Sequence, residues 1–419
     1  MLKGTQKLTK SQEKIIEIVE EYVKERTVDL NTHYLSVKTV NGKNKTHDIY
    51  ESIDMETYNS ELLKVSIVIL TANYFECEIL NYNVFKDYGK KIKKLCNGLQ
   101  LLHDRHIVKA YIMEINGYTI LHLHAPETGS NTPCGSSDLV RYVGACEFIE
   151  PSCIISFGIC YGTNTEEFSL GDTIIAEKIY PWSIGIKIND DGWKIKCDDY
   201  IIDLREQDAP LYDRVQEVIE STQNLCVNQK AKMGNMLTAE AVVSNERVKI
   251  QAIQNAYTCN IVGGEMEGYG LAKECIYYNK TPCMIIKAIC DWGAVKNIDE
   301  YIGEKIPEVN GYYKDKIQAY TTYCAYKVLN ELFMEKVFKR SNIIVSIHDK
   351  LLKKYYPDGS ISRDEFDDFI EKYLKNNYMK YSNMSVINQD SVKNAVVDTI
   401  VNLYFKPYNS GYIFNEHLF

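Results

Sequence analysis

The sequence predicts an α/β protein: a three-layer sandwich with a central mixed β-sheet flanked by helices, plus a small, mainly helical C-terminal domain. Short, nearly continuous apolar runs rich in β-branched residues are typical of strands buried on both faces of a sheet. These runs cover residues 65–70, 118–121, 153–157, 172–176 and 282–286. Helical patterns at residues 136–149 and 264–278 lie between several of them. Strands that alternate with helices indicate an α/β sandwich.

The N-terminal segment reads as a helical extension of about 60 residues. Residues 9–26 carry an apolar stripe at helical spacing, and Thr9 with Gln12 has the spacing of a capping box. An Asn-Gly pair at residues 41–42 then indicates a tight turn. We expect this extension, residues 1–60, to pack on the main domain or on a second subunit.

The texture of the sequence changes again after about residue 337. Charged residues become dense, aromatic residues are frequent, and helical patterns stand out at residues 363–376 and 390–405. A segment of this size is large enough to fold by itself. The predicted organisation is therefore an N-terminal extension (1–60), a main α/β domain (61–337) and a helical accessory domain (338–419).

Composition limits the classes of protein and of partner. Of the 419 residues, 45% are hydrophobic and 25% are charged, which is ordinary for a globular protein. A formal net charge of -9 offers no general attraction to nucleic acid or to an anionic membrane surface. The 13 cysteines include no Cys-x-x-Cys pair, and no long apolar segment is present. We therefore expect a cytoplasmic protein with reduced thiols and neither nucleic-acid nor membrane partners.

Carboxylates follow several of the predicted strands closely. Glu76, Gly158 and Asp291 each come just after an apolar run, so they should meet at one edge of the sheet, where open α/β sheets bind ligands. Two carboxylates in one cleft can take unlike roles when their surroundings separate their pKa values. Cleavage of a glycosidic bond needs such a division, because one group protonates the leaving group and another activates water.

Two motifs connect this pattern to a known family. Residues 265–268 read Glu-Met-Glu-Gly at a predicted helix start, and residues 288–291 read Ala-Ile-Cys-Asp at a predicted strand end. A weaker third match combines residues 158–162 with the Leu-Gly-Asp of residues 170–172. Together and in this order, they resemble the nucleoside phosphorylase-like superfamily, and most closely its methylthioadenosine/S-adenosylhomocysteine nucleosidase branch. The resemblance covers about residues 64–330.

This resemblance implies a role for each matched side chain. Asp291 would protonate N7 of a purine, and Glu76 would orient and deprotonate the attacking water. Glu267 would accept hydrogen bonds from the ribose hydroxyls, with Met266 packing against the sugar. The resemblance also implies an assembly of two or more copies, and the mechanism requires no metal or organic cofactor. Further substrate contacts are expected from Glu265, Gly158, Ile159, Val242, Val243, Trp292 and His124.

The chain departs from the nucleosidase pattern at several positions. Val242 stands where the family has a phenylalanine, so stacking on the base would come from Trp292 or Tyr161. Trp292 is itself a departure, and so is Cys290, where serine is usual. These changes leave the chemistry intact but leave the 5′ group of the substrate open.

Hydrolysis is favoured over phosphorolysis. A phosphorylase needs an arginine-lined phosphate pocket. The Gly-Asp-Pro-x-Arg and Arg-x-Gly-Thr patterns of the phosphorylases are absent from the sequence. The carboxylate of Glu76 would also repel phosphate. A phosphate-dependent phosphorylase remains the alternative.

Each singled-out residue also has a plainer interpretation. Glu76 and Glu265 lie near helix starts, where acidic residues favour the helix dipole, and Asp291 could cap a following helix. His122 and His124 alternate on one strand, but two histidines without a third ligand make a weak metal site, so no metal is predicted. Contact of His124 with a phosphate or ribose is a further hypothesis, with Arg141 and Lys287 as other candidates.

The segments outside the core leave three functions open. The first is a nucleosidase acting on an adenine nucleoside or nucleotide. The second is a regulated (d)ATP- or AMP-directed nucleosidase, since similar cores with accessory domains resemble bacterial defence effectors. The third is a non-catalytic nucleoside sensor, in which residues 338–419 would signal to a protein partner. The presence of both a candidate acid and a candidate base argues against the sensor.

Overall fold

The computed structural model describes the larger part of the chain, and every statement below concerns that part. It covers residues 9–41, 49–101, 107–125, 129–132, 134–146, 149–182, 186–189, 192–195, 200–222, 229–239, 249–250, 253, 260–294, 313–340, 360–362, 364–366, 368–369, 405–408 and 411–414. Within these residues, no helix combines the length and the apolar character that crossing a bilayer requires.

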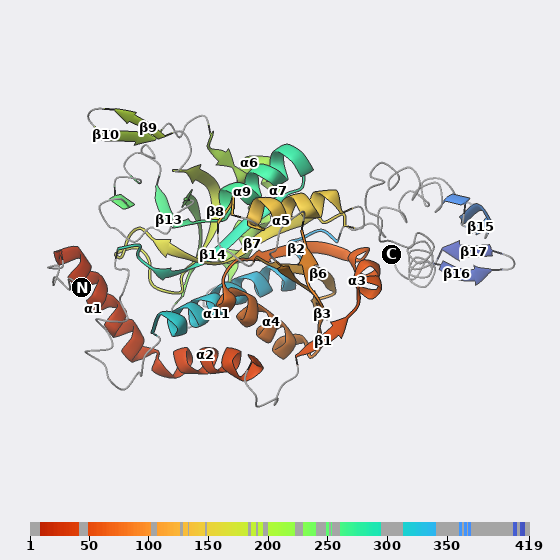
Figure 1. Ribbon diagram of the computed structural model, residues 1–419, viewed down its shortest axis with the longest axis horizontal. Helices are drawn as coiled ribbons and strands as arrows, with labels where there is room; N and C mark the ends of the chain where they lie inside the picture. Colours follow the sequence, from red (N-terminus) through yellow and green to blue (C-terminus); the bar gives the residue numbers. More distant parts are fainter. Residues whose placement is uncertain are drawn as a thin grey trace.

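A large mixed β-sheet forms the centre of the main domain (Figure 1). Its twelve strands are β1 (Tyr50–Ile53), β2 (Val65–Thr71), β3 (Ile92–Leu95), β4 (Leu99–Gln100), β5 (Ile107–Ile115), β6 (Tyr118–His124), β7 (Cys153–Gly162), β8 (Thr173–Pro181), β11 (Ile202–Asp203), β12 (Ala231–Thr238), β13 (Ile261–Glu265) and β14 (Cys283–Asp291). The order of neighbours is β1-β3-β5-β6-β2-β7-β13-β12-β8-β11, with β14 pairing with β7 and β8, and β4 with β5. The predicted mixed α/β fold is confirmed.

Part of the sheet closes on itself, which the open sandwich of the sequence analysis did not include. β14 pairs with both β7 and β8, so the strands β7, β13, β12, β8 and β14 form a closed ring of five. The pairing register shifts at Asn235/Met236, at Gly234/Asn235 and between Ile289 and Asp291. Such irregularities bend strands and increase their twist, which closure requires.

Helices cover the sheet on both sides (Figure 1). They are α1 (Lys10–Glu25), α2 (Thr27–Asn41), α3 (Met55–Leu62), α4 (Tyr74–Tyr88), α5 (Ser136–Ala145), α6 (Leu204–Gln207), α7 (Ala209–Ser221), α9 (Gly268–Lys273), the π-helix η2 (Glu274–Asn279) and α11 (Tyr313–Met334). The helices α2, α4 and α11 contact one another, and α11 also packs on β14. On the other side of the sheet, α5 contacts α9 and η2.

Helix α1 begins where the capping pattern predicts, and both N-terminal helices pack on the main domain. Thr9 and Gln12 form the expected capping box at the start of α1. Val23 of α1 and Leu30 of α2 are fully buried in the main core. The side-chain amide of Gln12 also donates to the carbonyl oxygen of Ala294 at 3.1 Å. The extension therefore contacts the segment that follows β14.

The described part of the C-terminal region contains strands beside the predicted helical segments. Its strands β15 (Ser360–Ser362), β16 (Phe405–Tyr408) and β17 (Gly411–Phe414) form an antiparallel sheet in the order β15-β17-β16. A mainly helical domain was predicted there, and within the predicted helix 363–376 the described residues 364–366 and 368–369 are helical. Most of the predicted helices at residues 363–376 and 390–405 lies outside the described residues.

Candidate active site

Glu76 is a buried carboxylate at the start of α4. Asn73 caps this helix, and Oε2 of Glu76 accepts hydrogen bonds from the backbone N–H groups of Ala72 and Asn73, both at 2.9 Å. The expectation that Glu76 merely supports a helix N-terminus is thus part of the answer. However, Oε1 accepts a hydrogen bond from the N–H of Ile159 in β7, also at 2.9 Å. The carboxylate is therefore fixed between a helix start and the central strand.

A glycine makes this position of Glu76 available. Gly158 has φ +152°, a conformation that L-residues with side chains rarely adopt. A Cβ atom on Gly158 would lie 1.9 Å from Oε1 of Glu76. Gly158 therefore provides space for the carboxylate of Glu76, and Ile159 donates to it, while their predicted contacts with substrate stay predictions.

Two further carboxylates lie where β13 ends and α9 begins. Glu265 is buried, and its Oε2 accepts from the backbone N–H groups of Glu267 at 2.8 Å and Gly268 at 2.7 Å. Its Oε1 accepts from the hydroxyl of Thr238. Because both oxygens of Glu265 bind protein groups, this side chain holds the turn that presents Glu267. The predicted substrate contact of Glu265 stays a prediction.

Glu267 is held from the opposite side by the segment after β6. Its Oε1 accepts from the N–H of Gly129 at 3.1 Å, and its own carbonyl accepts from the Ser136 hydroxyl at 2.6 Å. The Ser130 hydroxyl donates to the carbonyl of Met266 at 2.9 Å. This segment therefore fixes the predicted ribose-binding pair, Met266 and Glu267, through backbone and carboxylate contacts that the sequence analysis missed.

Lys287 joins the carboxylates into one cluster. It lies in β14, is 1% exposed, and places Nζ 3.1 Å from Oε2 of Glu267 and 4.0 Å from Oε1 of Glu76. Burial lowers the pKa of Lys287, but the negative charges of Glu267, Glu76 and Glu265 raise it by a larger amount. The net pKa is therefore above the usual value for lysine. Lys287 is therefore a buried cation. We call Glu76, Glu265, Glu267 and Lys287 the carboxylate–lysine cluster.

The charges within this cluster are not balanced. Burial raises the pKa of Glu76; the charge of Lys287 lowers that pKa, the charge of Glu267 raises it, and the net shift is upward. Burial and the charge of Glu267 raise the pKa of Glu265 to about 7. With one lysine among three carboxylates, protonation is favoured in this cluster above the usual pH range of acidic side chains.

Asp291 ends β14 at the same edge of the sheet. Strand register places Lys287 opposite Gly158 and Asp291 opposite Tyr161, while Gly264 of β13 lies opposite Tyr161 on the other side. Oδ1 of Asp291 accepts from the N–H of Gly293 at 2.7 Å. The residue is open to solvent, yet the protein packed around it raises the pKa of the carboxyl. Of the three predicted catalytic carboxylates, Asp291 thus ends β14, Glu267 follows β13, and Glu76 lies at the start of α4, where it accepts from Ile159 of β7.

Cys290 and Cys160 lie beside these groups. The thiol of Cys290 is 3.4 Å from Oδ2 of Asp291, so cysteine here contacts the candidate acid. Cys160 is buried and within electrostatic reach of Lys287, Asp291, Glu265 and Glu76. Burial raises the pKa of both thiols, which are therefore protonated at neutral pH.

The two histidines belong to a different cluster. Nε2 of His122 lies 2.8 Å and Nδ1 of His124 lies 3.1 Å from the Thr71 hydroxyl, and Nδ1 of His122 lies 2.9 Å from Oδ1 of Asn81. Burial lowers the pKa of both, that of His124 to about 4. We call these four residues the histidine cluster. The partner of His124 in it is Thr71, so its predicted contact with substrate stays a prediction.

The other predicted contacts are placed as follows. Arg141 pairs with Asp138 at 3.3 Å and with Glu274 at 2.6 Å, between α5 and η2. Trp292 is 2% exposed and packs over Gly162, whose Cβ would lie 2.6 Å from the indole ring. Val242 and Val243 lie outside the described residues. Within the described part, no three His, Cys, Asp or Glu side chains are arranged to hold a metal ion.

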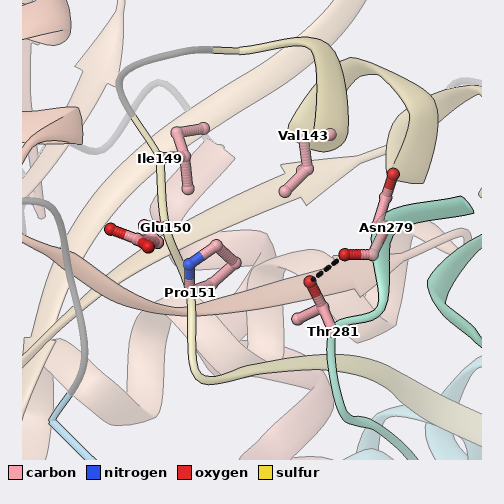
Figure 2. Close-up of a pocket in the computed structure, with 7 residues that line it drawn as sticks. Val143, Ile149, Glu150, Pro151, Asn279 and Thr281 are labelled. Atoms are coloured by element: carbon pink, nitrogen blue, oxygen red, sulfur yellow. Dashed lines mark hydrogen bonds between the residues drawn. The ribbon is translucent and has the colours of Figure 1, made fainter. Parts of the chain in front are cut away.

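A separate cavity of about 260 Å³ lies elsewhere (Figure 2). It is lined by Val143, Gly144, Ile149, Glu150, Pro151, Asn279 and Thr281. Pro151 and Thr281 lie two residues before β7 and β14, so the cavity lies at the amino ends of these strands, whereas Glu76 and Asp291 lie toward their carboxyl ends. It holds one ionisable side chain, Glu150, and does not form part of the candidate active site.

Comparison with known proteins finds similarity in structure only. No protein-family model and no curated protein matches the sequence. The structure is similar to methylthioadenosine/S-adenosylhomocysteine nucleosidase from Neisseria meningitidis in complex with methylthio-immucillin-A, with 14% identity, a TM-score of 0.46, and coverage of 64% of this chain and 98% of that chain. Futalosine hydrolase of Helicobacter pylori shows 14% identity, a TM-score of 0.45, and coverage of 65% and 98%. A Borrelia burgdorferi structure, described as a methylthioadenosine/S-adenosylhomocysteine nucleosidase bound to adenine, shows 18% identity, a TM-score of 0.46, and coverage of 64% and 99%.

Proposed function

We propose that the protein is a purine nucleosidase that hydrolyses the N-glycosidic bond of an adenine nucleoside or nucleotide and releases the free base. The observation that carries the proposal is the position of Glu76. A buried carboxylate with a raised pKa lies beside Glu267 and Lys287, at the same sheet edge as Asp291. A general base works best when its pKa is close to the working pH, and these surroundings move the pKa of Glu76 in that direction.

Asp291 and Glu76 take different roles in the proposed reaction. Asp291, with its raised pKa, donates a proton to N7 of the purine, and the electron pair of the glycosidic bond leaves with the base. The sugar then passes through an oxocarbenium-like state, which the negative charge of Glu76 and Glu267 stabilises. Water adds to the anomeric carbon, and Glu76 accepts its proton.

The hydrogen bonds of Glu76 leave one acceptor position of its carboxylate for this proton transfer. An ionised carboxylate has about four lone-pair positions, and three of them accept from the N–H groups of Ala72, Asn73 and Ile159. A lone pair therefore remains for a water molecule. Lys287, which contacts Glu267 and faces Glu76, keeps the cluster from accumulating three negative charges without a cation.

The same charges favour hydrolysis over phosphorolysis. Phosphate would have to approach Glu76 and Glu267 against like charge at short range, where electrostatic interactions are strong. Lys287 is already paired with Glu267. Water carries no charge and meets no such barrier.

A regulated nucleosidase acting on a nucleotide is the second candidate. It is favoured by the contact between Gln12 of α1 and Ala294, because a segment outside the nucleosidase core thereby reaches the loop that follows Asp291. The experiment on this candidate is to add AMP and ATP to the substrate panel and to compare the full chain with Gln12→Ala. A change in the ratio of nucleotide to nucleoside cleavage supports it.

A product assay tests the proposal. The full chain is incubated with adenosine, methylthioadenosine, S-adenosylhomocysteine, AMP and ATP, with and without phosphate, and free adenine is measured by chromatography. We expect adenine without phosphate and a loss of about 10²–10⁴-fold in Asp291→Asn. The matched control is Asp213→Asn, an exposed aspartate of α7 that pairs with Arg205. Release that requires phosphate, or release unchanged in Asp291→Asn, would contradict the proposal.

A further inference from the structure

Tyr161 is in β7, which lies between β14 and β13. β14 ends at Asp291, the proposed acid, and β13 leads to Glu267, the predicted ribose-binding carboxylate. In β7, Tyr161 pairs with Gly264 of β13 on one side and with Asp291 of β14 on the other. Its side chain is 8% exposed and packs with Ala239, at the end of β12, and with Trp182, after β8. The aromatic ring of Tyr161 therefore lies near the carboxyl ends of the five strands that form the closed part of the sheet.

The hydroxyl group of Tyr161 has no hydrogen-bond partner among the described residues. Buried polar groups are nearly always paired, because an unpaired one loses its bonds to water without replacement. The ring is also held tightly, since a Cβ on Gly264 would lie 2.2 Å from the hydroxyl oxygen and one on Gly293 would lie 3.2 Å from the ring. Burial and the nearby charge of Asp291 raise the pKa of Tyr161, so the hydroxyl keeps its proton at neutral pH.

The chemistry of a purine limits what this hydroxyl can meet. On the edge of the base that carries N7, the other hydrogen-bonding position is the substituent at C6, an amino group in adenine or an oxygen in hypoxanthine and guanine. A tyrosine hydroxyl can accept from the amino group or donate to the oxygen. Asp291 and Tyr161 are paired across β14 and β7. If Asp291 donates to N7, the hydroxyl of Tyr161 is therefore the group beside the C6 substituent.

We propose that Tyr161 determines the specificity for the base, its hydroxyl forming a hydrogen bond with the substituent at C6 of a purine. The proposal rests on the nucleosidase function proposed above and adds the side chain that recognises the base. Substrate binding then supplies a partner for a hydroxyl that has none among the described residues.

The test is a cycle of one variant against three bases. Wild-type protein and Tyr161→Phe are compared on adenosine, inosine and purine riboside, which carry an amino group, an oxygen and a hydrogen at C6. Binding of free adenine, hypoxanthine and purine is measured by calorimetry in parallel. We expect Tyr161→Phe to lose about tenfold in kcat/KM and in affinity for the base that the wild type prefers, and to change neither for the unsubstituted purine. A larger loss for adenine indicates that the hydroxyl accepts from an amino group, and a larger loss for hypoxanthine indicates that it donates to an oxygen.

Stability separates this role from a structural one. Because the Tyr161 hydroxyl has no partner in the described structure, Tyr161→Phe should unfold at the same temperature as the wild type or higher. The matched control is Tyr212→Phe. The hydroxyl of Tyr212 donates to the carbonyl of Cys283 at 3.2 Å, so this variant should lose stability without any change in base preference.

The outcomes distinguish this inference from the proposed function. An equal loss for all three bases, or no loss for any, would overturn the assignment of Tyr161 while base release by the wild type upholds the nucleosidase. Binding that depends on C6 and on Tyr161, without any base release, would uphold the assignment and overturn the enzyme. Wild-type protein that neither binds nor releases purines would overturn both.

Discussion

The carboxylate–lysine cluster and the histidine cluster are both polar and largely buried, and each takes one side chain from α4, but they are balanced in opposite ways. The histidine cluster is neutral, and each of its side chains has a partner within the cluster. The other cluster places one cation among three carboxylates and depends on a glycine with φ +152°. Buried charge and backbone strain are costly, and proteins retain them chiefly at functional sites. The comparison supports the proposal that the carboxylate–lysine cluster performs chemistry, whereas the histidine cluster supports the sheet.

The largest effect should come from Glu76→Gln. Removing the proposed base should lower kcat by about 10²–10⁴-fold, measured by base release at saturating substrate. Because the new amide nitrogen can face the N–H of Ile159, the fold is checked by circular dichroism. Activity within a few-fold of the wild type, with the fold intact, would remove the functional distinction between the two clusters.

Lys287→Met should cause the largest loss of stability. The buried Glu76 and Glu265 and the partly buried Glu267 would lose their cation, and breaking a buried ion pair by removing one partner costs about 3–5 kcal/mol. Urea unfolding measures the change. The control Lys232→Met removes an exposed pair with Glu167, joined at 3.1 Å, and should change the free energy of unfolding by less than about 1 kcal/mol. Equal losses in both variants would show that the cluster is not charged as described.

Thr71→Val affects the histidine cluster alone. It removes the hydroxyl that joins His122 and His124 and leaves buried ring nitrogens without this partner, so the free energy of unfolding should fall by about 1–3 kcal/mol. Activity per folded molecule should persist, because the contacts of Glu76 are unchanged. If kcat fell as far as in Glu76→Gln, the histidine cluster would belong to the active site.

In the pH dependence of stability, the two clusters have opposite signs. Glu265, with a pKa raised to about 7, binds its proton more tightly in the folded state, so its contribution to stability is lost as the pH rises from about 4.5 to 7. His124, with a pKa lowered to about 4, is protonated first in the unfolded chain, so its contribution is lost as the pH falls from about 6.5 to 4.

Variants separate these two contributions. In urea unfolding between pH 4.5 and 7, Glu265→Gln should make stability rise more steeply with pH than in the wild type, and His124→Gln should make it rise less steeply. Slopes that change in the same direction in both variants would contradict the opposite balance of the two clusters.

Local sequence patterns predicted much of the fold. The apolar runs became β2, β6, β7, β8 and β14, since a continuous β-branched run can only be satisfied in the interior of a sheet. The capping box of Thr9 and Gln12 also formed, because its bonds join residues three apart. The placement of Glu76 and Asp291 at one edge followed from strand direction alone.

Tertiary structure decided what depends on partners distant in the sequence. Closure of the five-stranded ring requires β14 to pair with β7 and β8, more than a hundred residues earlier in the chain, and no local pattern encodes such pairing. Glu265 and Glu267 are two residues apart and read alike in the sequence. Their roles differ because Thr238 donates to Glu265, which then holds the turn, whereas Lys287 forms an ion pair with Glu267. Lys287 itself, a lysine in an apolar strand, was a signal of a buried charge, but its role came from two carboxylates brought to it by other elements, because electrostatic interactions act through space and not along the chain.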